Sequence, residues 1–159
     1  MARLTIWGVE GIGEISPQDQ LGEIIADACR QAPNGPLLDD DVLVVTQKIV
    51  SKAEGRLVPI DANDPLSHKH LVEQEAVRIV RRRGDLIITE TKHGFICANS
   101  GIDLSNIERG YAALLPIDSD KSARRIRDII RAKHGVNVGV VISDTFGRPW
   151  RKGLTDVAI

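Results

Sequence analysis

The chain has 159 residues, of which 42% are hydrophobic and 27% charged, and its formal net charge at pH 7 is −1. This length is sufficient for one domain with a buried core. The balanced charge gives no indication of a nucleic-acid or membrane surface. Every apolar stretch is too short to span a bilayer, and no signal peptide is recognisable, so we predict a cytoplasmic protein without nucleic-acid or membrane partners. The cysteines, Cys29 and Cys97, lie far apart in apolar settings and predict buried thiols.

The N-terminal region is predicted to contain a strand, a glycine-rich segment and a helix. Residues Leu4–Trp7 alternate weakly and indicate the strand, and the glycine-rich segment that follows includes Ile12–Ile15. This segment does not match the dinucleotide-binding fingerprint, and a tight turn is a more ordinary interpretation than a ligand contact. Apolar residues at helical spacing predict the helix from Pro17 to Ala32.

A buried strand at Val42–Thr46 is predicted to lead directly into a short helix at 47–56. Lys48 and Lys52 are four residues apart, so their ammonium groups leave the same face of that helix. Two stacked cations suit a polyanion such as a nucleoside triphosphate. A solvated basic face is the alternative that these residues leave open.

The following elements are predicted from periodicity and turn residues. They are a strand at Leu57–Ile60, a helix at Ser67–Arg82 that ends in the basic run Arg81–Arg83, hairpin strands at Asp85–Thr91 and Phe95–Asn99, a strand at Ala112–Ile117, and a helix capped by Asp118 that reaches Lys133 before Gly135. Together with the other elements they predict an α+β fold with mixed α/β layers.

Two carboxylates are candidates for a ligand site. Asp103 and Asn106 lie three residues apart in a loop, so their side-chain oxygens can face one ligand, although a self-capping turn is slightly favoured by these residues alone. Asp144 follows the uncharged strand Val138–Ile142, and we expect it in a loop at the end of that strand. Hard oxygen ligands of this kind suit Mg²⁺ or Mn²⁺.

Three segments, VVTQKIVSKAEGR, ITETKHGFICANSGIDLSN and VVISDTFGRPWRKGLTDVAI, occur in this order. Together they resemble the N-terminal portion of the ligase domain in the coenzyme F420-0:L-glutamate ligase (F420 gamma-glutamyl ligase) family. The resemblance implies an α+β fold that forms an intertwined homodimer. It also implies a GTP-dependent ligase that adds L-glutamate to coenzyme F420-0 through an acyl phosphate, with further glutamates added through γ-linkages. The implied cofactors are Mg²⁺ or Mn²⁺ together with K⁺.

The resemblance also assigns individual residues. As metal ligands it implies Asp103 and Asp144, with Thr145 beside Asp144. As nucleotide contacts it implies Gln47, Lys52, Asn106 and the backbone of Ile12, Gly13, Glu14 and Ile15. Gly13 stands where the family typically has proline. No residue is assigned as the general base.

Two further expectations concern the extent of the chain and its activity. Because it stops on the apolar run Val157–Ile159, we expect a single ligase-type domain over 1–159 that is incomplete at its C-terminal end and inactive alone. The alternative to a ligase is a nucleotide- or metal-binding module, or a diverged paralogue without ligase activity. Phosphate release from GTP that requires both F420-0 and glutamate would distinguish the ligase from the module.

Overall fold

The computed structural model describes residues 3–159, which form a mixed α+β structure, as the sequence predicts. The strands are arranged in three small sheets. The helices are α1 (Leu21–Gln31), α2 (Gln47–Ala53), α3 (Lys69–Glu75) and α4 (Ser119–His134), and a short 3-10 helix, η1, covers Asn99–Gly101. The strands are β1 (Val42–Thr46), β2 (Leu57–Pro59), β3 (Ala76–Arg83), β4 (Leu86–Thr91), β5 (Ile96–Ala98), β6 (Tyr111–Ala113), β7 (Gly139–Gly147) and β8 (Leu154–Ala158). Within this part of the chain, no helix combines the length and the apolar character that crossing a membrane requires.

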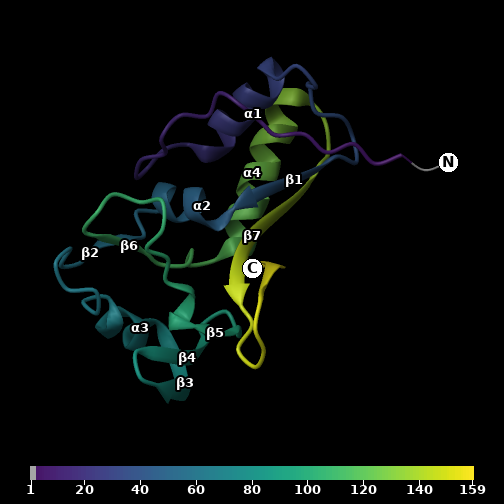
Figure 1. Ribbon diagram of the computed structural model, residues 1–159. Helices are drawn as coiled ribbons and strands as arrows, with labels where there is room; N and C mark the ends of the chain where they lie inside the picture. Colours follow the sequence, from purple (N-terminus) through teal and green to yellow (C-terminus); the bar gives the residue numbers. More distant parts are fainter. Residues whose placement is uncertain (1–2) are drawn as a thin grey trace.

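The sheet that positions the candidate site has the strand order β1-β7-β8. β1 and β7 are parallel, with Val42 opposite Gly139 and Thr46 opposite Ser143. β8 returns antiparallel to the second half of β7 (Figure 1). Because β1 and β7 run in the same direction, the start of α2 lies beside the second half of β7.

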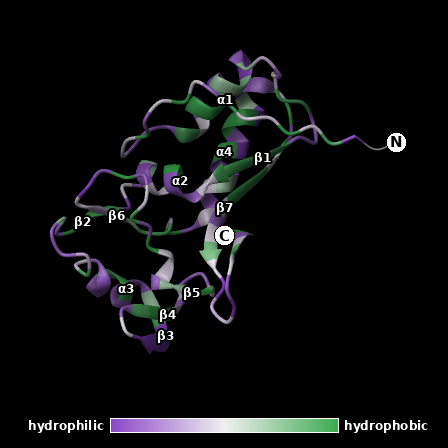
Figure 2. Cartoon of the chain, viewed as in Figure 1, coloured by the Kyte–Doolittle hydropathy of each residue, from purple (hydrophilic) through white to green (hydrophobic). Residues whose placement is uncertain are grey.

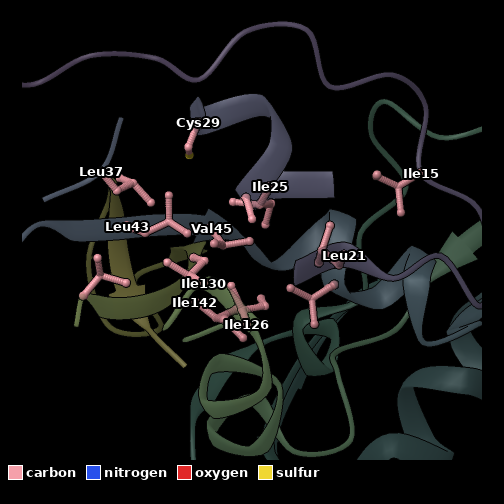
Figure 3. Packing of buried hydrophobic residues seen from close by; sticks show 13 residues of the cluster. Ile15, Leu21, Ile25, Cys29, Leu37, Leu43, Val45, Ile126, Ile130 and Ile142 are labelled. Atoms are coloured by element: carbon pink, nitrogen blue, oxygen red, sulfur yellow. The ribbon is translucent and has the colours of Figure 1, made fainter. Parts of the chain in front are cut away.

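The main hydrophobic core lies between this sheet and the helices α1 and α4 (Figure 3). Leu43 and Val45 of β1 point into it and are 8% and 3% exposed, whereas Val44 between them is 63% exposed. This alternation follows from the two-residue repeat of a strand. On α4, Ile126 and Ile130 lie one turn apart and are both buried, which places the apolar stripe of the helix against the core.

A second part of the molecule contains α3 and the antiparallel sheet β3-β4-β5 (Figure 1). The two-stranded ladder β2-β6 pairs the segment before α3 with the segment after η1, so the chain enters and leaves this second part through neighbouring strands. Arg56, just after α2, ties the two parts together. Its Nε donates to the Leu115 carbonyl at 3.0 Å, and its Nη2 donates to Glu75 Oε2 of α3 at 2.8 Å.

The prediction of one helix over Ser67–Arg82 is wrong. The helix α3 ends at Glu75, and the chain continues as β3, which pairs with β4. The β-branched residues Val77, Ile79 and Val80 favour an extended backbone, and pairing with β4 supplies the hydrogen-bond partners that a lone strand lacks. The basic run Arg81–Arg83 therefore lies on a strand and does not complement a helix dipole.

The predicted strand at Leu4–Trp7 is also not formed. The segment is irregular, and Leu4 and Ile6 are 83% and 85% exposed. No neighbouring strand pairs with it within residues 3–159, and a strand without a partner leaves its backbone groups to water. Trp7 still packs against the main core from this segment, as does Ile12 from the glycine-rich segment that follows.

The other predicted elements are confirmed, with shifts at their ends. α1 begins at Leu21 rather than at Pro17, and β6 is shorter than predicted. Hydropathy colouring shows β1 as an apolar segment and the turn between β7 and β8 as hydrophilic (Figure 2).

At α4, the Asp118 carboxylate accepts from the Lys121 backbone N–H at 2.8 Å, and Gly135 ends the helix with φ 72°. Both signals act as predicted.

Replacing Asp118 with alanine is expected to lower the free energy of unfolding by about 1 kcal/mol, because one N–H of the first turn loses its acceptor. For a domain of this size, the melting temperature should fall by roughly 2–4 °C. Asp128→Ala is the control, since Asp128 is exposed in the middle of α4 and contacts Arg127 only at 3.5 Å. Equal melting temperatures for the two variants would contradict a capping role.

Candidate functional site

A cavity of about 630 Å³ lies where β1, the segment after β5 and the β7-β8 hairpin meet. Five of the site residues that the resemblance implies line this cavity. They are Gln47, Asp103, Asn106, Asp144 and Thr145. They come from three segments far apart in the sequence, and the parallel pairing of β1 with β7 brings two of these segments together.

Asp103 is held by both its backbone and its side chain. Its N–H donates to the Ala113 carbonyl at 3.0 Å, and its carbonyl accepts from the Ala113 N–H at 2.9 Å. Its Oδ1 accepts hydrogen bonds from the N–H and the hydroxyl of Ser105, each at 2.7 Å. Burial alone would raise the pKa of Asp103, but hydrogen bonds from Lys48 and Ser105 outweigh it and hold this pKa below its usual value. The carboxylate is therefore charged and faces the cavity in a fixed orientation.

Asp144 lies inside β7, opposite Val157 of β8. The prediction that it sits in a loop after the strand is therefore wrong: β7 continues to Gly147 because β8 pairs with it. Its Oδ1 accepts from the Thr145 N–H at 2.8 Å. Burial raises the pKa of Asp144, the charges of Asp103 and Asp156 raise it further, and the Thr145 N–H and Lys48 oppose them. A bound cation would stabilise the charged form.

Lys48 provides the ammonium group closest to this pair of carboxylates. Its Nζ lies 2.9 Å from Asp103 Oδ2 and donates to the Ser105 carbonyl at 2.5 Å. Its side chain is 19% exposed. A cation that binds to Asp103 must share this carboxylate with Lys48 or displace the lysine from it.

Lys52 and the glycine-rich segment form a separate group, outside the residues that line the cavity. Lys52 is 7% exposed, and its ammonium group pairs with the carboxylate of Glu14. Of the rest of this segment, Ile15 is buried in the main core, whereas Gly13 has open space around it. The structure thus places Glu14 next to Lys52. Because Lys52 is buried and Lys48 is partly buried and paired with Asp103, the two lysines do not form a solvated basic face.

Asp156 and Cys97 also line the cavity, and neither is assigned to the site from the sequence. Asp156 of β8 accepts a hydrogen bond from the Thr145 hydroxyl at 2.5 Å. The alternation in the last strand could have predicted its position only if the hairpin had been recognised. Cys97 is 1% exposed; burial, followed by the charge of Asp144, raises its pKa to about 11. Its thiol is therefore protonated at neutral pH.

The oxygen atoms at this cavity fit a small divalent cation. Asp103, Asp144 and Thr145 offer hard ligands, but no group of three or more His, Cys, Asp or Glu residues in the 3–159 region is arranged to hold a metal ion alone. Mg²⁺ in nucleotide sites is commonly bound by one or two carboxylates, with water and phosphate oxygens completing the shell. The residues present therefore suit a cation that arrives with a phosphate ligand.

Known proteins of one family resemble this chain over most of its length. The family model described as "F420-0:Gamma-glutamyl ligase" matches residues 11–159. The "Coenzyme F420:L-glutamate ligase" of Methanopyrus kandleri is 42% identical over 160 residues, which cover 92% of this chain and 61% of the relative. The protein of the same name from Methanothermobacter thermautotrophicus is 37% identical, with 98% of this chain and 67% of the relative covered. A third, from Methanococcus maripaludis, is 44% identical over 78% of this chain and 55% of its own length.

The chain thus spans between 55% and 67% of the length of these relatives. The family match covers all three segments that meet at the cavity and every site residue that the resemblance implied. The chain belongs to the F420-0:gamma-glutamyl ligase family.

Proposed function

We propose that this chain forms the GTP- and cation-binding part of a ligase that joins L-glutamate to coenzyme F420-0 and adds further glutamates through γ-linkages. One observation carries the proposal: five residues implied by the resemblance line a single cavity although they lie on three separate segments. A volume of about 630 Å³ is within the range of cavities that bind small ligands. The family's relatives named as coenzyme F420:L-glutamate ligases support the same assignment.

The proposed reaction has two steps. A carboxylate oxygen of F420-0 attacks the γ-phosphorus of GTP, so that an acyl phosphate forms and GDP leaves. The amine of L-glutamate then attacks the acyl carbon, inorganic phosphate leaves with the C–O bond electrons, and the amine loses a proton. Because phosphoryl transfer depends mainly on positioning and charge neutralisation, the protein's part is to orient the phosphates and to balance their charge.

Within this proposal, Asp103, Asp144 and Thr145 hold Mg²⁺ or Mn²⁺. When bound, this cation supplies charge neutralisation for the phosphate oxygens. Asn106 and Gln47 contact the nucleotide from the cavity wall. Lys52 and the segment Ile12–Ile15 contact it from outside the present lining, and this requires Lys52 to exchange its Glu14 partner for phosphate.

Three parts of the proposal rest on the resemblance alone. They are a requirement for K⁺, assembly into a homodimer, and the organisation of residues 1–159 as one ligase-type domain. No residue is assigned to K⁺ or to removal of the proton from the glutamate amine.

The test is a pair of measurements on one preparation of the intact protein that contains this chain, because residues 1–159 alone are expected to be inactive. Equilibrium dialysis should show GTP binding that requires Mg²⁺ or Mn²⁺. Phosphate release should then occur only when F420-0 and L-glutamate are both present. Metal-dependent GTP binding without any substrate-dependent phosphate release would instead support the nucleotide-binding module, and absence of GTP binding would contradict the proposal as a whole.

A further inference from the structure

The side chain of Gln47 is held by a small hydrogen-bond network at the wall of the cavity. Gln47 is 1% exposed and Ser51, one helical turn later, is fully buried. Gln47 Nε2 donates to Ser51 Oγ at 2.6 Å and to the Leu114 carbonyl at 3.1 Å. The Ser51 hydroxyl in turn donates to the same Leu114 carbonyl at 2.7 Å.

This network fixes which end of the carboxamide faces inward. The Leu114 carbonyl can only accept hydrogen bonds, so the Ser51 hydroxyl uses its hydrogen on that carbonyl and offers only lone pairs to Gln47. Both inner partners of the carboxamide are therefore acceptors. A flipped carboxamide would bring its own oxygen against the Leu114 carbonyl oxygen. The Ser51 hydroxyl has a single hydrogen, so only one of the three hydrogen bonds of this network could then form. Such a buried mismatch is strongly disfavoured.

The outward end of the carboxamide is consequently its oxygen. Among residues 3–159, no group donates a hydrogen bond to Gln47 Oε1. This oxygen is also not one of the fully buried polar atoms that lack a partner, so it keeps some contact with solvent. Gln47 itself lines the cavity. The side chain thus presents a hydrogen-bond acceptor to whatever occupies the cavity.

We infer that Ser51 is a positioning residue. Together with the Leu114 carbonyl, it holds the Gln47 side chain so that the acceptor Oε1, and not the donor Nε2, faces the cavity. This inference rests on the proposed nucleotide site, and it specifies how that site selects its ligand. Gln47 pairs with a hydroxyl or N–H group of the nucleotide, either on the ribose or on the base. It does not contact a phosphate oxygen, because two acceptors would then face each other.

The orientation of Gln47 can be tested without any ligand. In wild-type protein, the side-chain NH₂ of Gln47 should exchange its hydrogens with solvent far more slowly than that of exposed Gln18, as measured by ¹⁵N-edited NMR. The Gln47 signal is assigned by its loss in Gln47→Leu. Exchange at the rate of Gln18 would overturn the inference, whether or not nucleotide binds.

The selectivity of the site is tested with a series of GTP analogues, each lacking one donor: the 2′-hydroxyl, the 3′-hydroxyl or the exocyclic amine. Wild-type protein should bind one of these analogues roughly five- to tenfold more weakly than GTP, the effect of one hydrogen bond. In Ser51→Ala only the Leu114 carbonyl still orients the carboxamide, so this discrimination should decrease and the Gln47 NH₂ should exchange faster. Ser51→Cys, nearly isosteric but a weak hydrogen-bonding group, should lie between the two and serves if Ser51→Ala does not fold.

Ser100→Ala is the matched control. Ser100 is also buried, and its hydroxyl donates to a backbone carbonyl, that of Val72, at 2.8 Å. It should therefore lose a similar amount of stability while its discrimination among analogues stays at the wild-type value. Ser51→Ala that discriminates like wild type, or Ser100→Ala that loses discrimination equally, would overturn the positioning role. If wild-type protein binds no nucleotide at all, the proposed function fails, and the exchange measurement still decides the orientation of Gln47.

Discussion

Replacing Asp144 with asparagine is expected to weaken cation-dependent GTP binding by about 2–5 kcal/mol, the range for removing one partner of a buried charge pair. The free energy of unfolding should not decrease together with the affinity for GTP. Asp144 lies in a partly buried position near Asp103 and Asp156, and burial raises its pKa, so that the folded state favours the protonated form more than the unfolded chain does. Its charged form therefore costs stability once the pH rises above the ordinary carboxyl value. The neutral amide removes that cost, so the melting temperature without ligand should stay the same or rise.

Isothermal titration with Mn²⁺ and GTP, together with a thermal melt, checks both parts of this expectation. Asp128→Asn serves as control, because Asp128 is exposed on α4 and far from the cavity lining. Unchanged Mn²⁺ and GTP affinity in Asp144→Asn would remove Asp144 from the site. A large fall in melting temperature would show that the carboxylate serves the fold instead.

The second large effect is expected at Lys52. Lys52→Met should reduce GTP affinity by about 2–5 kcal/mol, because a buried ammonium group that meets phosphate would be lost. Methionine retains most of the aliphatic volume at this buried position, so the change removes the charge with little loss of packing. GTP titration of the variant measures the effect directly.

Glu14→Gln separates a phosphate-binding role for Lys52 from a structural ion pair. In the structure, the Glu14 carboxylate pairs with the Lys52 ammonium group and is itself highly exposed. If phosphate and Glu14 compete for Lys52, removing the carboxylate's charge should leave GTP affinity unchanged or improve it. If the pair only stabilises the fold, Glu14→Gln and Lys52→Met should both lower the melting temperature and neither should alter GTP affinity. Lys48→Met, measured alongside, should have the smaller effect on affinity if Lys52 is the main phosphate contact.

The sequence predicts best those elements whose signals are local. Asp118 and Gly135 mark the ends of α4 through caps that involve only neighbouring residues. The segment Ala76–Arg83 is predicted as helix but forms a strand, because its apolar residues fit one face of a helix as well as a strand. Only its pairing with β4 decides between the two. Leu4–Trp7 shows the converse: its sequence alternates like a strand, but no strand within residues 3–159 pairs with it, and it stays irregular.

The same distinction applies to the candidate site. The motif residues at Gln47, Asp103 and Asp144 could be named from the resemblance, and the cavity lining includes all three. Asp156 could not be found, because it reaches the cavity only through the hairpin pairing of β8 with β7. The sequence also does not predict that Lys52 lies outside the cavity lining. Helical spacing gives the direction of its side chain but not that Glu14 pairs with it.

The parallel pairing of β1 with β7 also sets the order in which the protein can mature. During synthesis, β1 leaves the ribosome nearly a hundred residues before Gly139, its first partner on β7. Local units such as the β4-β5 hairpin can form meanwhile, but Gln47 and Asp144 cannot meet until the chain is complete through β7. Contacts of such long sequence separation form slowly. The proposed nucleotide site should therefore form only after nearly all of residues 1–159 have been translated, so that binding at this site would report late on correct folding.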